Sequence, residues 1–135
     1  MNIEATSTFH ITGWDEQPYQ ALADGAKLTR AKVTQSYQGI ITGTSALEYL
    51  MAYASDGTAS FVGIEHVTGE VADKAGSFII QHIGTFEGGK ARSAWRVIAG
   101  AGTGALAALR GEGAYVAGHG EPATVTFRYS FEPRV

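Results

Sequence analysis

The stretch that decides the fold is residues 44–98, which read TSALEYLMAYASDGTASFVGIEHVTGEVADKAGSFIIQHIGTFEGGKARSAWRVI. Three turn signals divide it into four segments of alternating polarity: Ser55-Asp56-Gly57-Thr58, Ala72-Asp73-Lys74-Ala75-Gly76 and Glu87-Gly88-Gly89-Lys90. Asp-Gly and Gly-Gly between alternating segments are typical of β-hairpins, because a type I′ turn needs positive φ at both central residues. The stretch therefore predicts a four-stranded antiparallel meander.

The turn lengths predict which side chains face one another across the meander. Two-residue turns at Asp-Gly and at Gly-Gly, with a four-residue turn between them, place one row across the four strands: Glu48, Glu65, His82 and Trp95. Successive side chains of a strand point to opposite faces, so a five-residue turn at residues 72–76 would instead turn His82 outward.

The two faces of the meander differ in composition. The face with the row is predicted to be the inside, and it also carries Leu50, Phe61, Val67, Phe78, Ile80, Phe86 and Val97, with Gly63 opposite Gly84. The other face carries Arg92 and Arg96 and is expected to meet water. It also carries an apolar set that predicts a protein contact and hence a homo-oligomer: Tyr49, Met51, Tyr53, Val62, Ile64, Ile79 and Ile83.

The rest of the chain completes an all-β pattern. Further strands are predicted at residues 5–12, 27–38, 113–117 and 124–131, a loop at 13–24, a turn at 118–122 and one short helix at 105–109, the only good helix-forming run. Eight strands with short turns favour a closed antiparallel barrel, which leaves no sheet edge exposed. We expect one domain over residues 1–135, with an interior that side chains fill or that holds one small ligand.

Composition and charge limit the functional classes. The net charge is −3, charged residues make up 17% of the chain, and no cluster of Lys and Arg occurs, which argues against nucleic-acid binding. There is no cysteine, no apolar run long enough to span a membrane, and no basic start followed by an apolar segment. We therefore expect a cytoplasmic protein without a membrane or nucleic-acid partner.

Several motifs, taken in order, resemble one family over nearly the whole chain. They are Trp14-Asp15-Glu16, Leu28-Thr29-Arg30-Ala31, the segments 48–53 and 56–63, Gly76-Ser77-Phe78, Gln81-His82, and Gly102-Thr103-Gly104 through to Leu109-Arg110-Gly111-Glu112-Gly113. Together they resemble the bacterial domain-of-unknown-function family 3224. The resemblance implies a calycin-like, eight-stranded barrel similar to plant allene oxide cyclase, and it supplies no function. The sequence departs from the family pattern at residues 72–76, where the family tends to carry an Asp-Gly-Arg-type turn.

The row of polar side chains is the candidate catalytic site. Two carboxylates side by side in an apolar lumen, Glu48 and Glu65, cannot both ionise easily, so the pair is expected to hold a proton that it could pass to a substrate. His82 would orient and tune Glu65. The structural alternative is a hydrogen-bonded pair beside a satisfied core histidine. The side chains expected to shape a ligand are Phe61, Phe78, Ile80, Trp95, Tyr115, Phe127 and Tyr129.

Metal and phosphate chemistry are weaker alternatives. Glu48, Glu65 and His82 make a workable ligand count for zinc or iron, but no second histidine joins the row, so we expect no metal and no cofactor. The glycine-rich segment 100–104 lacks the Gly-Lys-Ser/Thr ending of a phosphate loop.

The favoured hypothesis is a barrel that binds a small apolar or amphipathic molecule, with cyclisation or isomerisation as the candidate reaction. The alternative is a non-catalytic oligomeric module with a filled core, and cavity volume separates the two. If Glu65 is retained for function, its replacement with leucine is expected to raise stability.

Overall fold

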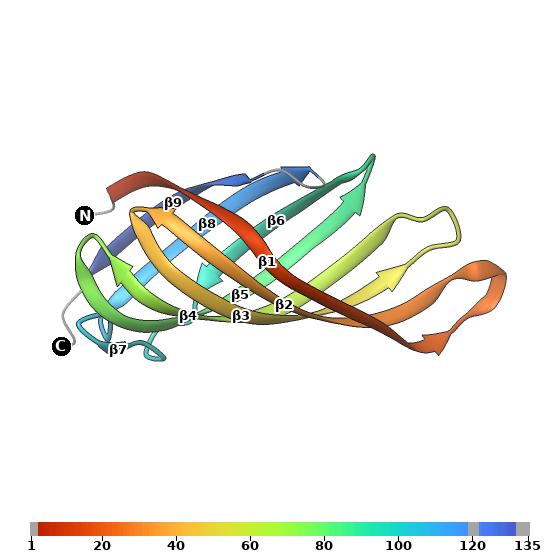
Figure 1. The fold of residues 1–135 in the computed structure, drawn as a ribbon, viewed down its shortest axis with the longest axis horizontal. Helices are drawn as coiled ribbons and strands as arrows, with labels where there is room; N and C mark the ends of the chain where they lie inside the picture. Colours follow the sequence, from red (N-terminus) through yellow and green to blue (C-terminus); the bar gives the residue numbers. More distant parts are fainter. Residues whose placement is uncertain (1–2, 119–121, 132–135) are drawn as a thin grey trace.

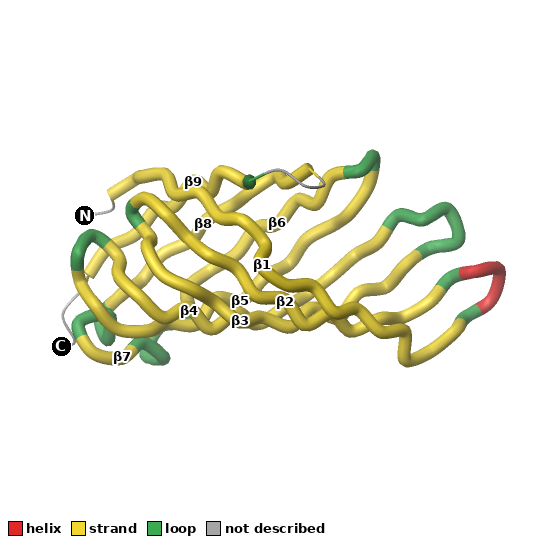
Figure 2. Tube along the Cα trace, viewed as in Figure 1, coloured by secondary structure: helices red, strands yellow, loops and turns green. Residues whose placement is uncertain are grey.

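The computed structural model describes residues 3–118 and 122–131 of the 135-residue chain. Nearly all of these residues lie in strands, as the yellow tube of Figure 2 shows. The elements in chain order are β1 (Ile3–Ala21), the 3₁₀ turn η1 (Ala23–Gly25), β2 (Lys27–Gly39), β3 (Ile41–Tyr53), β4 (Ala59–Val71), β5 (Lys74–Glu87), β6 (Lys90–Val97), β7 (Thr103–Gly104), β8 (Leu109–Gly118) and β9 (Ala123–Phe131).

The long strands form a closed eight-stranded antiparallel barrel, which confirms the predicted fold class. Each of β1 to β6 pairs with its neighbour in sequence, β6 pairs with β8, β8 with β9, and β9 returns to β1 (Figure 1). The two-residue strand β7 lies outside this ring and pairs with β5. Among the described residues no helix has the length and apolar character needed to cross a membrane.

Two predicted elements are wrong. The loop expected at residues 13–24 is mostly strand, because register shifts near Gly13 and near Pro18 let β1 stay paired with β2 as far as Ala21. The short helix expected at residues 105–109 is a series of turns, in which Leu106 and Leu109 each donate to the carbonyl three residues earlier. Both leucines are buried and cover one end of the core. Part of the turn expected at residues 118–122 lies outside the described residues.

The turn between β3 and β4 is longer than its Asp-Gly sequence predicts. Tyr53 pairs with Ala59, so residues 54–58 form a five-residue connection. Oδ1 of Asp56 accepts hydrogen bonds from the backbone nitrogen of Thr58 at 3.0 Å and from its hydroxyl at 2.7 Å, and these bonds hold the wider turn. They also lower the pKa of Asp56. The connection is three residues longer than the predicted two-residue turn, and this odd difference reverses the facing of β3 relative to the prediction.

The other two hairpin turns preserve the predicted facing. Ala72 and Asp73 form a two-residue turn with φ of 51° and 67°, and Val71 pairs with Lys74. This turn is two residues shorter than predicted, and an even difference leaves His82 pointing inward. The Gly88-Gly89 turn pairs Glu87 with Lys90 and sets His82 opposite Trp95, as predicted.

Large rings in the lumen lie across glycines of the neighbouring strand. A Cβ atom added to these glycines would overlap the ring of the residue paired with it, so only glycine leaves room for the ring to lie flat on the strand. The pairs are Tyr49 with Gly63, Phe61 with Gly84, and Trp95 with Gly113. The predicted pairing of Gly63 with Gly84 is therefore wrong, because each glycine faces a ring-bearing residue or His82 instead.

The lumen is packed at one end and lined by a separate cluster at the other. The larger cluster includes Ile41, Val71, Phe78, Leu106 and Leu109, and it fills the end where β1 begins and β9 ends (Figure 1). The smaller cluster comprises Ala31, Val33, Leu47, Tyr49, Met51, Ala59 and Phe61. At this second end the β1–β2 and β3–β4 hairpins project beyond the other strands (Figure 1).

A candidate ligand cavity above a buried polar network

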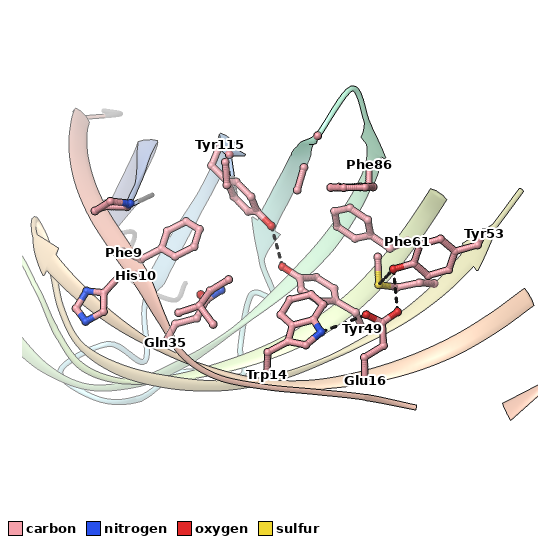
Figure 3. Close-up of a pocket in the computed structure, with 17 residues that line it drawn as sticks. Phe9, His10, Trp14, Glu16, Gln35, Tyr49, Tyr53, Phe61, Phe86 and Tyr115 are labelled. Carbon is pink, nitrogen blue, oxygen red and sulfur yellow. Dashed lines mark hydrogen bonds between the residues drawn. The ribbon is translucent and has the colours of Figure 1, made fainter. Parts of the chain in front are cut away.

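The second end of the barrel contains a cavity of about 630 Å³. This volume lies within the range of small-molecule sites. Seven of its lining residues are aromatic, and several of them are shown in Figure 3: Phe9, Trp14, Tyr49, Tyr53, Phe61, Phe86 and Tyr115. The lining also includes Met51, Ala91, Ala117 and the polar residues His10, Glu16 and Gln35. The site is therefore largely apolar with a few polar groups at fixed places.

Two tyrosines meet across the lumen at the inner limit of this cavity. The hydroxyl of Tyr49 on β3 lies 2.8 Å from the hydroxyl of Tyr115 on β8 (Figure 3). In the ring of eight strands, β3 and β8 stand four positions apart, so the pair spans the barrel. Only 4% of Tyr49 and 7% of Tyr115 are exposed. The pair forms a polar floor between the open and the packed halves.

A hydrogen-bonded network lies behind this floor, with one side chain from each of the consecutive strands β2 to β6. Oε2 of Glu65 accepts from the hydroxyls of Tyr37 at 2.6 Å and of Ser45 at 2.5 Å. Oε1 of Glu65 lies 2.7 Å from Nε2 of His82, whose Nδ1 lies 2.9 Å from Oγ of Ser93. Glu65 is fully buried, and the network gives each member at least one partner.

Burial and the carboxylate of Glu65 hold the nearby phenols in their neutral form. Burial is the main cause that raises the pKa of Tyr37 and of Tyr49 well above the ordinary value, and Glu65 raises both further. The pKa of Tyr115 rises to about 12, chiefly through burial. Over the usual working range of pH, these hydroxyls therefore remain hydrogen-bond donors.

Glu16 forms a second polar point on the cavity wall. Its Oε1 accepts from the indole nitrogen of Trp14 at 3.1 Å, and its Oε2 accepts from the hydroxyl of Tyr53 at 2.8 Å (Figure 3). Oε2 also accepts from the hydroxyl of Thr29 at 2.6 Å. Burial and this carboxylate raise the pKa of Tyr53 to about 12. The three donors fix the carboxylate in place and link strands β1, β2 and β3.

The structure brings together two of the three predicted catalytic residues. Glu65 and His82 are in contact, although Glu65 pairs directly with Ile80 and reaches His82 diagonally. The predicted inward position of Glu48 is wrong, because the five-residue turn places it on the outer face. There its side chain is 55% exposed and lies 3.2 Å from Nε of Arg30. The proton-sharing pair of Glu48 and Glu65 therefore does not exist.

The residues expected to shape a ligand divide between the two halves of the lumen. Phe61 and Tyr115 line the cavity. The other five belong to the packed core: Phe78, Ile80, Trp95, Phe127 and Tyr129.

The corrected register also exchanges residues between the faces of β3. Leu50 is exposed, whereas Tyr49 and Met51 point inward.

Sequence reasoning missed several groups of the site. Tyr37, Ser45 and Ser93 were not assigned to it, although each lies on the inward face of an alternating strand. Alternation alone could have placed Tyr37 near the row. Glu16 was missed because its segment read as a loop, so no face could be assigned to it.

These features define a small antiparallel β-barrel with an internal cavity above a buried carboxylate–imidazole contact. The model of the family described as "Protein of unknown function (DUF3224)" matches residues 5–129, so the chain belongs to this family. A solved structure of a protein with unknown function from the DUF3224 family of Shewanella oneidensis MR-1 is similar, with a TM-score of 0.79 and 29% sequence identity over 99% of this chain and 100% of that chain. A search of the curated proteins found no match.

Proposed function

We propose that the protein binds one small apolar or amphipathic molecule in the open half of its barrel. The observation that carries this proposal is the cavity of about 630 Å³, whose lining is mostly aromatic and aliphatic. A barrel kept only for stability gains from filling such a space, because empty apolar volume costs packing energy. The barrel similar to plant allene oxide cyclase that the sequence resemblance implies agrees with a luminal ligand and identifies none.

Filling the cavity is expected to abolish binding of a neutral apolar probe. Ala117 on β8 lines the cavity, and Ala114 on the same strand faces outward. We expect N-phenyl-1-naphthylamine to gain fluorescence with the wild type and with Ala114→Phe, and to bind Ala117→Phe at least about tenfold more weakly, since the new ring occupies the site. Equal binding by both variants, with unchanged near-UV circular dichroism, would place the probe outside the cavity and contradict the proposal.

A second candidate function is a proton shift within the bound molecule, as in an isomerisation or a cyclisation. It is favoured by the contact of Glu65 with His82 next to the floor of the cavity. The ring centroid of His82 lies 5.6 Å from that of Tyr49 and 6.1 Å from that of Tyr115. Removal of a proton next to a carbonyl and its return from heavy water would place deuterium in the methyl group of 2-acetylnaphthalene. We expect this exchange to be faster with the wild type than with Glu65→Gln, as NMR would measure. Equal rates would exclude this role for Glu65.

The alternative function is a non-catalytic module that assembles with copies of itself. It is supported by the exposed apolar side chains Val62, Ile64 and Ile83 on adjacent strands β4 and β5. Tyr49 and Met51 are no longer part of that face, so the apolar patch is smaller than the sequence predicted. Native mass spectrometry would measure the number of subunits and any retained ligand together. A homo-oligomer in the cytoplasm, without a nucleic-acid or membrane partner, is the setting we propose for either function.

A further inference from the structure

The floor of the cavity holds one more hydroxyl proton than its hydrogen bond uses. Tyr49 and Tyr115 have one proton each, and the single bond between their oxygens consumes one of the two. Whichever hydroxyl donates, the proton of the other is left over. Ser93 forms a side-chain hydrogen bond that lowers the pKa of Tyr115, as a bond donated to the tyrosine oxygen does, so this contact does not use the leftover proton. A nearly buried O–H donor at the end of an apolar cavity favours a ligand that accepts a hydrogen bond.

The charges around the cavity disfavour an anion as that acceptor. None of the described residues that line it is Lys or Arg, while Glu16 contributes a carboxylate to its wall. Behind the floor, the carboxylate of Glu65 is close enough to raise the pKa of both tyrosines. An anionic group placed against the tyrosines would lose its hydration without gaining a cationic partner.

Resting on the proposed function, we propose that the tyrosine pair selects the ligand class: a neutral, largely apolar molecule whose inner end is an uncharged acceptor such as a carbonyl or ether oxygen. The leftover proton of Tyr49 or Tyr115 donates to that oxygen. The tyrosine pair therefore recognises the polar end of the ligand by a hydrogen bond, and the apolar part of the ligand packs against the aromatic wall.

Three probes of nearly the same shape test this inference. They are 2-acetylnaphthalene, which has a neutral acceptor, 2-isopropylnaphthalene, which has none, and 2-naphthoate, which is an anion at pH 8. Their affinities are measured by displacement of N-phenyl-1-naphthylamine from the wild-type protein. We expect the ketone to bind about tenfold more tightly than the hydrocarbon, the effect of one buried hydrogen bond, and to exceed the carboxylate by at least as much.

Variants of the pair distinguish hydrogen bonding from shape. In Tyr49→Phe or in Tyr115→Phe the remaining hydroxyl keeps its proton, so each single variant should retain the preference for the ketone. The double variant has no donor at this point, and the ketone should lose its advantage over the hydrocarbon while the hydrocarbon still binds. The unfolding temperature of each variant shows whether the barrel remains folded.

The outcomes separate this inference from the proposed function. If the hydrocarbon and the reporter bind but the ketone has no advantage, or if 2-naphthoate binds as tightly as the ketone, the inference is wrong and the proposed function stands. A preference that persists in the double variant also overturns it. If neither the reporter nor any probe enters the folded wild-type protein, the proposed function fails and the inference fails with it.

Discussion

Glu65→Leu should unfold at a markedly lower temperature than the wild type, with a loss of about 3–5 kcal/mol in the free energy of unfolding. The carboxylate of Glu65 is the partner of Tyr37, Ser45 and His82, and all of these groups are buried. Leucine fills the same space but leaves the hydroxyl of Ser45 and Nε2 of His82 without their partner, and it leaves Tyr37 with only its 3.4 Å hydrogen bond to Gln35. For a chain of this size the loss corresponds to roughly 10 °C or more in the midpoint of thermal unfolding.

The matched control for this change is Glu48→Leu. Glu48 lies on the adjacent strand, and its side chain is exposed beside Arg30. Loss of such a surface ion pair is expected to change stability by less than about 1 kcal/mol. Thermal and urea unfolding of the two variants measure both effects. A Glu65→Leu protein as stable as the wild type would mean that the network contributes nothing net. A Glu65→Leu protein more stable than the wild type would instead agree with the sequence-based expectation that a glutamate retained for function costs stability.

Gly113→Ala is expected to cost about 2–3 kcal/mol, because the added methyl group meets the indole ring of Trp95. That ring cannot withdraw easily, since it is buried and its centroid lies 5.2 Å from that of Phe127. Urea unfolding at constant temperature gives the difference in free energy, and an unchanged dependence on urea concentration would show that the unfolded state is not affected.

A double-mutant cycle with Trp95→Leu identifies the cause of this cost. In the Trp95→Leu background the indole is absent, so the same Gly113→Ala change should cost less than about 0.5 kcal/mol. The expected coupling of about 2 kcal/mol is then the measured effect of the ring lying on the glycine. A cost of Gly113→Ala that is the same in both backgrounds would instead locate the strain in the backbone of β8.

The barrel itself could be predicted from the sequence, because alternation and turn chemistry are local properties. The Gly88-Gly89 pair fixed one register, and the inward position of His82 survived a wrong length for the preceding turn. His82 still points inward because Ala72 and Asp73 form a turn two residues shorter than predicted, and an even difference in length does not change which face a side chain occupies. The face to which a side chain points therefore depends more on whether the turn has an odd or an even number of residues than on the type of turn.

The parts that could not be predicted depend on contacts distant in sequence or on side chains acting within a turn. Asp56 binds Thr58 in a connection three residues longer than its Asp-Gly sequence predicts, and this odd difference places Glu48 at the surface. Residues 13–21 extend as strand because β2 offers them a partner, despite a proline and a glycine. The run at 105–109 has helical composition but is too short to pay for nucleation without a packed face.

For the candidate site, the contact between Glu65 and His82 could be predicted and the position of the cavity could not. Which half of a barrel is filled depends on where large rings end up along the axis, and those positions follow from the register of every strand. With β3 assigned the wrong facing, Tyr49 was placed outside, so the tyrosine pair that divides the lumen could not be foreseen.

The pairing of β1 with β9 has a consequence for how the chain folds. These two strands lie at opposite ends of the described sequence, so the ring cannot close until β9 has left the ribosome. Until then the sheet has two open edges, formed by β1 and by the last strand made, and such edges are sites of aggregation. Contacts between residues so far apart in sequence also slow folding, because the entropy cost of closing a long loop comes before the contacts that stabilise it. The final step of folding in this molecule is therefore expected to be a slow one, in which the two edges find each other.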